Sequence, residues 1–160
     1  MNYQYFASPI GRLRLVSNGT HLLRIEFEGQ YVKGPGEQAT TDAVLDAASD
    51  QLTAYFGGRR QSFSLPTAAH GTVFQQTVWQ ALQDIPFGQV RSYRDIACAL
   101  GNAAAVRAVG AANGRNPLPI IVPCHRVIGS NGSLTGFAGG LSAKKILLQL
   151  EGALQGDGAW

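Results

Sequence analysis

The chain has 160 residues and a mass of 17.0 kDa, with 45% apolar and 14% charged residues. This length fits one domain or two small ones, and so apolar a composition excludes extensive disorder, which requires high charge and low hydrophobicity. No apolar run reaches the roughly 20 residues of a membrane span, and the N-terminus lacks the features of a secretory signal. We therefore expect a cytoplasmic protein with no membrane partner.

The net charge of +3 lies in the second half of the chain. From Met1 to Ala68, six basic side chains balance six acidic ones. Between Ile85 and Arg126, Asp95 is opposed by five arginines, namely Arg91, Arg94, Arg107, Arg115 and Arg126. The guanidinium group suits contacts with phosphates and bases, so the pattern favours nucleic-acid binding. A solvated basic face is the alternative.

Residues 1–68 predict an N-terminal α/β domain. Apolar residues on both sides of Asn18-Gly19 indicate a hairpin, and Gln30 to Thr41 has the composition of a loop. Apolar residues at helical spacing predict a helix from Asp42 to Tyr55. We expect a short strand at Phe63–Leu65, and an interdomain linker at Pro66–Gly71.

Residues 69–155 predict a helical domain, followed by a tail at 156–160. Thr72 with Gln75, and Ser92 with Asp95, have the spacing of capping boxes at two helix starts. Their helices carry the apolar positions Phe74, Val78, Trp79 and Leu82, and Ile96, Ala97 and Leu100. A third helix, from Ala103 to about Asn113, follows a tight turn at Gly101, which makes a helix-turn-helix candidate.

The remaining segments are less regular. Three prolines between Asn116 and Cys124 predict a stiff extended segment, and five glycines between Gly129 and Gly140 predict an irregular loop. A last helix is expected from Ser142 to Glu151, with Ile146, Leu147 and Leu150 facing inward, and a loose tail from Gly152 to Trp160.

Cys124 is the candidate nucleophile, because the next residue is His125 and a thiol reacts as the thiolate. Side chains alternate on an extended strand, so the chain must bend at Pro123 or Cys124, or a water must lie between thiol and imidazole. Glu151 could orient the imidazole. The alternative is a buried, unreactive thiol. Cys98 is expected to be such a core thiol, and two cysteines without suitable histidines predict no metal site.

The third helix is built from small residues around Arg107. Alanine and glycine predominate where a helix that recognises the major groove would carry large polar side chains. Such a smooth surface can approach the minor groove closely, and one arginine could enter the base stack. An alanine-rich packed helix with one exposed arginine is the alternative.

The motif Pro123-Cys124-His125-Arg126 follows Asn116-Pro117 and Arg107-Ala108-Val109-Gly110. Together these residues resemble the O6-alkylguanine-DNA alkyltransferases, also called methylated-DNA–protein-cysteine methyltransferases, from about Thr72 to Gly152. The resemblance implies an α+β protein, with a ribonuclease-H-like α/β domain before a helical, winged helix-turn-helix-like domain. Related non-transferring homologues have Trp at the position of Cys124, so this chain is expected to be active.

The resemblance also implies the reaction. One alkyl group passes from O6 of a flipped guanine in double-stranded DNA to Cys124, once per protein molecule and with no cofactor; O4-alkylthymine stays open as a second substrate. The expected partner is double-stranded DNA that contains O6-alkylguanine, which a monomer of the protein would bind through the minor groove. His125, Glu151 and a water would deprotonate the thiol, Asn116 would brace its turn, and the carbonyls of Cys124 and Val127 would accept from the guanine amino group.

Further residues are implied in the same way. Tyr93 would crowd the 3′ phosphate, which promotes its rotation, and would hydrogen-bond N3 of the base. Arg107 would fill the gap in the base stack. DNA contacts are expected from Tyr93, Arg107, Ala108, Gly110, Ala111, Arg115 and Arg126. The substrate pocket would be lined by Pro119, Val127, Phe137, Ala138 and Gly139.

Phe137 departs from the family pattern, which commonly has Tyr there, and this predicts fewer donors to O6. Gly139 and Gly140 predict room for bulkier alkyl groups. Three rival functions remain at this stage: a thiol hydrolase, a helix-turn-helix regulator, and a protein that binds lesions without repairing them.

Overall fold

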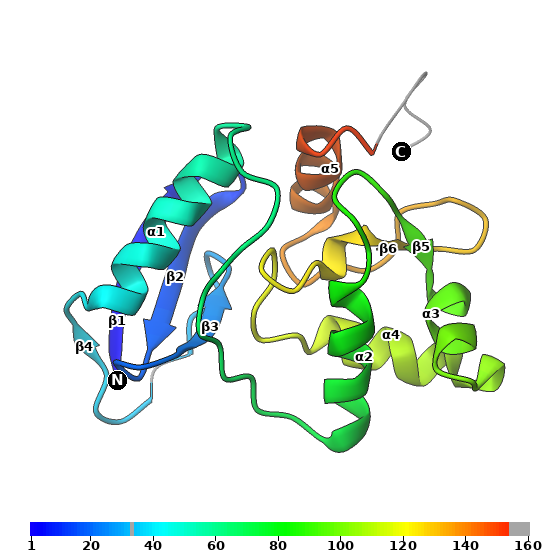
Figure 1. Ribbon diagram of the computed structural model, residues 1–160, viewed down its shortest axis with the longest axis horizontal. Helices are drawn as coiled ribbons and strands as arrows, with labels where there is room; N and C mark the ends of the chain where they lie inside the picture. The colour runs from blue at the N-terminus through cyan, green and yellow to red at the C-terminus, as the bar shows by residue number, and fades with distance from the viewer. Residues whose placement is uncertain (33, 154–160) are drawn as a thin grey trace. The chain divides into compact units, whose positions relative to one another are not determined.

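The computed structural model describes residues 1–32 and 34–153, which form two compact units that divide between His70 and Gly71 (Figure 1). Both units contain helices and strands, so the predicted α+β class is confirmed. Among the described residues, no helix is long and apolar enough to cross a membrane.

A four-stranded sheet forms the base of the first unit. Its strands are β1 (Asn2–Ser8), β2 (Gly11–Ser17), β3 (Leu22–Glu26) and the short β4 (Gln38–Ala39), in the order β3-β2-β1-β4. Only β4 runs parallel to its neighbour, β1. The predicted hairpin is confirmed: Asn18 Oδ1 accepts from the backbone of Thr20 and His21, and Gly19 has a φ of +93°.

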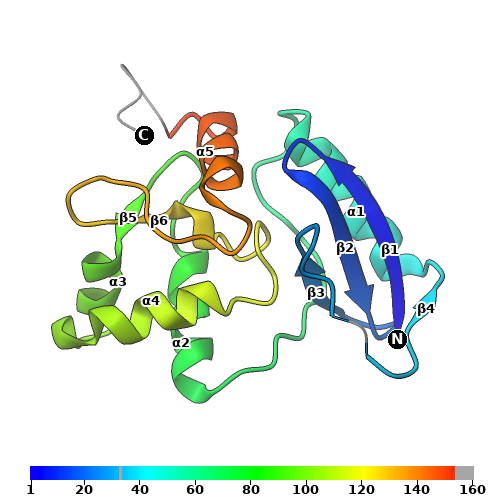
Figure 2. The same cartoon turned by 180° about the vertical axis from the view of Figure 1, so that it is seen from behind.

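Helix α1 (Ala43–Phe56) covers one face of this sheet (Figures 1 and 2). Asp42 caps it by accepting from Leu45 N, as expected of an aspartate before an apolar-periodic run. The predicted inward face is confirmed, since Val44, Leu45, Ala48, Leu52 and Tyr55 are buried. Leu13 and Leu15 of β2 are fully buried, and each such side chain contributes about 1.5–3 kcal/mol through removal from water.

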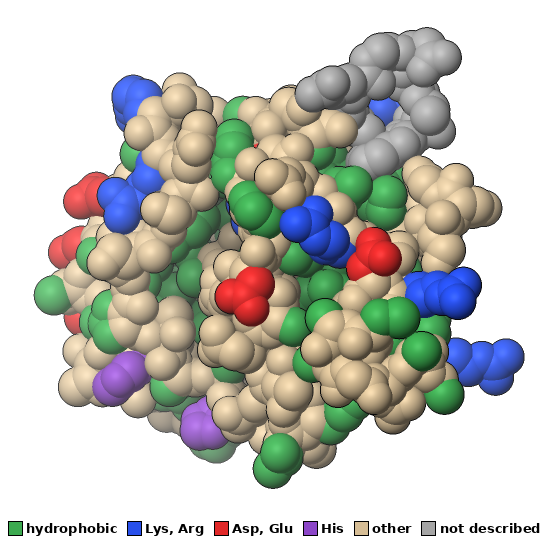
Figure 3. All heavy atoms as spheres, turned by 45° about the vertical axis from the view of Figure 1, so that its right-hand side comes forward, with side chains coloured by type: hydrophobic (Ala, Val, Ile, Leu, Met, Phe, Trp, Pro, Cys, Tyr) green, Lys and Arg blue, Asp and Glu red, His purple; other side chains and the backbone are tan. Residues whose placement is uncertain are grey.

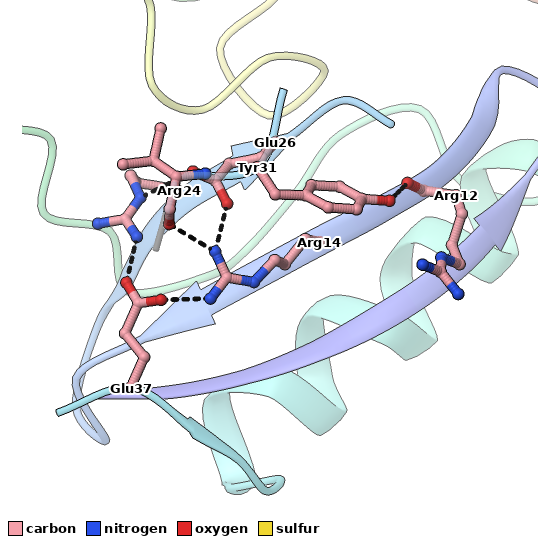
Figure 4. A network of polar contacts seen from close by, with 7 residues as sticks. Arg12, Arg14, Arg24, Glu26, Tyr31 and Glu37 are labelled. Atoms are coloured by element: carbon pink, nitrogen blue, oxygen red, sulfur yellow. Dashed lines mark hydrogen bonds and ion pairs between the residues drawn. The ribbon is translucent and has the colours of Figure 1, made fainter. Parts of the chain in front are cut away.

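A network of charged side chains joins β2 and β3 to Glu37 (Figure 4). Arg14 is 2% exposed and donates to Glu26 Oε1 and to Val32 O, both at 2.8 Å, and also to Glu37. Arg24 Nη2 donates to Glu37 Oε1 at 2.6 Å. Burial alone would raise the pKa of Glu37, but the hydrogen bonds from the two arginines outweigh it and lower this pKa.

The strand predicted at Phe63–Leu65 is wrong. The side chain of Gln51 accepts from Ser64 N and donates to Ser64 O, so it takes the backbone groups that a strand would pair. The following segment is also not free linker, because Leu22 N donates to Pro66 O and Ala68 N donates to Leu22 O. These residues therefore belong to the edge of the first unit.

The second unit contains four helices and a pair of very short strands among its described residues. The helices are α2 (Val73–Gln83), α3 (Tyr93–Ala99), α4 (Val106–Gly114) and α5 (Leu141–Leu150). A 3-10 turn, Ala103–Ala105, precedes α4. Strands β5 (Arg91–Ser92) and β6 (Val127–Ile128) pair in parallel. Both predicted capping boxes, Thr72–Gln75 and Ser92–Asp95, are confirmed.

Several predicted inward positions of these helices are wrong. Phe74 is 37% exposed, and Leu100, Ile146 and Leu150 are only half-buried. Cys98 is exposed, not a core thiol, because Ile96 and Ala97 already fill the inner face of the seven-residue α3. The predicted tail lies outside the described residues from position 154 onward.

We predict that Arg14→Leu lowers the free energy of unfolding by about 3–5 kcal/mol, because it leaves buried carboxylates without their main cation. Urea or thermal unfolding measures this loss. Arg59→Leu, at an exposed position of the same unit, is the matched control and should change stability by less than about 0.5 kcal/mol. Equal stability of the two variants would show that the buried network contributes nothing.

Candidate active site

Residues 116–124 form a compact turn, so the prediction of an extended segment is wrong. Val122 N donates to Leu118 O at 2.8 Å, and Asn116 braces the turn from both ends. Its Nδ2 donates to Val122 O at 2.8 Å, and its Oδ1 accepts from Leu118 N at 3.0 Å. Ile120 is buried with a φ of +75°, which is rare for a β-branched residue and persists only where packing enforces it.

The turn delivers Cys124 into the 3-10 helix Cys124–Arg126. Cys124 N donates to Val122 O at 2.7 Å, and Arg126 N donates to Pro123 O at 3.1 Å. Of the two alternatives that the sequence leaves open, the bend at Pro123 or Cys124 is therefore present. It places both candidate reactive groups inside the protein, with Cys124 5% and His125 0% exposed.

Glu151, at the C-terminal end of α5, contacts the imidazole as the sequence suggested. Its Oε2 lies 2.8 Å from His125 Nε2, and both side chains are fully buried. Burial lowers the pKa of His125, so the ring is neutral near pH 7. Since a carboxylate can only accept, Nε2 carries the proton and Nδ1 is left as a base. Nδ1 is buried and has no hydrogen-bond partner among the residues that the structure describes.

Arg126 does not lie where a DNA contact requires it. The residue is 7% exposed, and its guanidinium donates to both oxygens of Glu151 and to Ile85 O at 2.6 Å. Its charge is already paired inside the protein, which corrects the expectation that it contacts a phosphate. Arg126 instead neutralises and hydrogen-bonds the carboxylate of Glu151, which orients His125.

Lys144 is a residue of the site that the sequence analysis missed. It is fully buried on α5, and its Nζ donates to Val127 O at 2.5 Å, Thr135 O at 2.9 Å and Gly136 O at 3.4 Å. Burial lowers its pKa to about 8. The spacing in the sequence does indicate its burial: Lys144 lies three and four residues before the buried Leu147 and Leu148, which places it on the same face of the helix.

The thiol of Cys124 is neutral in this environment. Burial raises its pKa to about 11, while a hydrogen bond with Asn116 and the charge of Lys144 act in the opposite direction. A nucleophilic thiolate therefore has to be produced by removal of the proton within the site. The unpartnered nitrogen of His125 and the nearby ammonium group are the two features suited to that step.

The outer face of α4 matches the smooth surface expected from its sequence. Arg107, Ala108, Ala111 and Arg115 are exposed, whereas Val109 and Ala112 are buried. Gly110 is half-buried, so it belongs to the margin of this face. Trp79 of α2 fixes the helix from behind, since its Nε1 donates to Ala112 O at 2.8 Å.

The predicted pocket residues come from two segments with different exposure. Pro119 and Val127 are buried, Phe137 and Gly139 are half-buried, and Ala138 is exposed. The glycine-rich loop that carries the last three is irregular, as predicted. Tyr93, at the start of α3, donates from its hydroxyl to Thr135 O in this loop at 3.2 Å, so Tyr93 and Lys144 converge on one carbonyl. Among the described residues, no group of His, Cys, Asp and Glu could hold a metal ion.

We predict that the rate at which Cys124 reacts with iodoacetamide rises from pH 7 through pH 9 without a plateau, because the thiolate is the reacting form. Lys144→Met should lower the rate at pH 7, since it removes the neighbouring cation, and should lower it less at pH 9, above the Lys144 pKa of about 8. Peptide mass spectrometry measures the alkylation, and the exposed Cys98 reports reagent activity in the same sample. A plateau already at pH 7 would contradict a neutral resting thiol.

Comparison with known proteins matches both units. Residues 1–69 match the family model described as "6-O-methylguanine DNA methyltransferase, ribonuclease-like domain", and residues 73–153 match the DNA binding domain of the same family. The chain is 59% identical to the constitutive methylated-DNA–protein-cysteine methyltransferase of Bacillus subtilis, over 94% of this chain and 96% of that one. It is 48% identical to the Methanosarcina acetivorans protein of the same name, over 96% and 99% of the two chains.

A solved structure also resembles the chain as a whole. It is the crystal structure of Mycobacterium tuberculosis OGT in complex with DNA, with a TM-score of 0.89 and 44% identity. The alignment covers 96% of this chain and 94% of that one. The predicted arrangement of a ribonuclease-like domain before a helical DNA-binding domain is thereby confirmed.

Proposed function

The chain belongs to the 6-O-methylguanine DNA methyltransferase family, and from this we propose that it repairs DNA by moving an alkyl group from O6 of guanine onto Cys124. The observation that supports Cys124 as the acceptor is its position in the turn that also carries His125, with Glu151 2.8 Å from the imidazole. A thiol, a base and a group that orients the base are the parts that nucleophilic displacement requires.

The reaction balances without any co-reactant. The sulfur of Cys124 attacks the alkyl carbon, so an S–C bond forms as the C–O6 bond breaks and its electrons pass to O6. The proton that leaves the thiol ends on the nucleobase, which thereby becomes unmodified guanine. The product on the protein is a thioether, which thiol exchange cannot reverse, so each molecule repairs one lesion and the reaction needs no cofactor.

His125 Nδ1 is the acceptor that we assign to the thiol proton, by way of a water between the two groups. The imidazolium that forms is stabilised by the carboxylate of Glu151, which is already hydrogen-bonded to Nε2. The ammonium group of Lys144 favours the developing thiolate electrostatically. Asn116 keeps the turn, and thus the sulfur, in place.

DNA is the partner that the family and the DNA-bound relative support. We propose that α4 enters the minor groove with its small exposed residues, and that Arg107 fills the space left by a flipped base. Tyr93 is placed beside the glycine-rich loop, where it could rotate the 3′ phosphate and bond N3. On the face shown in Figure 3, Lys and Arg side chains are spread out rather than gathered in one large patch. We propose that few cationic side chains contact the phosphates, so that binding depends only modestly on salt, and that a monomer is the binding unit.

We predict one alkyl transfer per protein molecule. After incubation with a duplex that carries one O6-methylguanine, the Cys124 peptide should gain the mass of one methyl group, with a plateau at one lesion repaired per chain. Cys124→Ser should show no gain, whereas Cys98→Ser, at the exposed thiol, is the matched control and should react as wild type. Tight lesion binding without modification would instead indicate a protein that marks damage.

We further predict that Phe137→Tyr speeds methyl transfer about tenfold, because a phenolic hydroxyl in the pocket can donate to O6 as negative charge develops there. Single-turnover kinetics with saturating duplex measures the rate. Tyr93→Phe, which removes the hydroxyl that donates to Thr135 O of the same loop, should not speed the transfer. Equal rates for wild type and Phe137→Tyr would show that O6 is already fully hydrogen-bonded.

A further inference from the structure

Trp79 of α2 holds the C-terminal end of α4. The residue is 5% exposed, and its Nε1 donates to Ala112 O at 2.8 Å. The last four carbonyls of an α-helix have no partner within the helix, and Ala112 lies in the last turn of α4. Arg115 N donates to the same oxygen at 3.2 Å. Loss of the indole N–H would therefore leave this carbonyl paired, so the fold does not depend on the bond from Trp79 alone.

The indole ring is also packed closely on the edge remote from its nitrogen. A Cβ atom at Gly71 would lie 2.4 Å from Cη2 and 2.7 Å from Cζ3 of Trp79. Real Cβ atoms do not approach other atoms so closely, so only glycine fits at position 71 without displacing the ring. The ring is thus held against the chain at Gly71 while its single donor reaches Ala112 O.

The end of α4 that Trp79 holds also contacts the turn of the nucleophile. Asn113, which follows Ala112, donates from Nδ2 to Cys124 O at 3.3 Å. Arg107, which we propose to fill the space left by the flipped base, is exposed on the same helix. It precedes Ala112 by five residues, or about 7.5 Å along a helix axis. One short helix therefore carries both the group proposed to enter the DNA and a group bonded to the peptide of the nucleophile.

We infer that Trp79 is a positioning residue for alkyl transfer, whose bond to Ala112 O sets the place of α4, and thus of the DNA bound to it, relative to the sulfur of Cys124. This inference rests on the proposed function. The turn itself is held from other segments, by Asn116 and Glu151. Loss of the indole N–H should therefore slow transfer from DNA and leave the intrinsic reactivity of the thiol unchanged.

The experiment replaces Trp79 by benzothienylalanine, a tryptophan analogue in which sulfur takes the place of the indole N–H, so that the ring keeps its shape and loses its donor. Single-turnover methyl transfer from an O6-methylguanine duplex to Cys124 is measured at increasing duplex concentration. Alkylation of Cys124 by iodoacetamide is measured without DNA. Trp79→Phe gives the same comparison should the analogue protein fail to fold.

We expect the transfer rate at saturating duplex to fall about tenfold, because a misplacement of about 1 Å can lower a rate by about 100-fold. The duplex concentration that gives half the maximal rate should stay unchanged, and so should the rate with iodoacetamide. Thr77→Val is the matched control, because it removes a side-chain bond to Val73 O on the exposed side of α2. This variant should react as wild type in both assays.

Three results would overturn the inference. Transfer as fast as in wild type would show that the bond from Trp79 positions nothing. An equal loss of rate with the duplex and with iodoacetamide would show that Trp79 is merely structural. A change confined to the half-saturating duplex concentration would assign it to DNA binding. Failure of the proposed function would look different, because wild-type Cys124 would then react with iodoacetamide and stay unmodified by the duplex.

Discussion

The carboxylate of Glu151 holds the active-site turn to the end of α5. It is fully buried, and three nitrogens from His125 and Arg126 satisfy its two oxygens. A buried carboxylate is tolerated only when it is paired in this way. The segment at Gly88, where φ is +81°, also packs closely against Glu151. A Cβ atom at position 88 would lie 3.1 Å from the backbone oxygen of Glu151. The group that orients the proposed base is thus also a tie between distant segments of the second unit.

Buried charge specifies both units, although the chain as a whole has few charged residues. Arg14 is hydrogen-bonded to a main-chain carbonyl as well as to carboxylates. Arg126 donates to Ile85 O and Lys144 to Thr135 O, and both carbonyls lie in irregular segments. Such bonds fix loops that have no helical or strand ladder of their own. In the second unit, the fixed segments are those that surround Cys124. Charge therefore sets the shape of the site before it contributes to the chemistry.

The sequence predicted the features that depend on local chemistry. Asn18-Gly19, the two capping boxes and the apolar face of α1 were all identified, because a turn or a cap is decided by a few neighbouring residues. The Pro-Cys-His-Arg motif also led to the family. The pairing of His125 with Glu151, 26 residues away, is suggested by the residues themselves and implied by the family resemblance.

The errors arose where a distant group decided the outcome. Gln51 takes the backbone groups of the strand predicted around Ser64, 13 residues away. The turn at 116–124 is a different case, because Asn116 folds it locally, as the family resemblance implies, through bonds to Leu118 and Val122. The burial of Arg126 and Lys144 is not predictable from the local sequence, because the carbonyls and the carboxylate that accept their hydrogen bonds come from elsewhere in the chain. Burial of a long cation cannot be inferred without knowing its partners.

Cys124, the proposed nucleophile, is buried, whereas Cys98, which has no proposed role, is exposed. A general thiol reagent will therefore report first on the cysteine that has no assigned role, and a preparation whose Cys124 is already consumed will still titrate as thiol-containing. For a protein that is used up as it works, concentration and active concentration are separate quantities. The number of molecules that can still react is therefore measured by titration with DNA that carries the lesion.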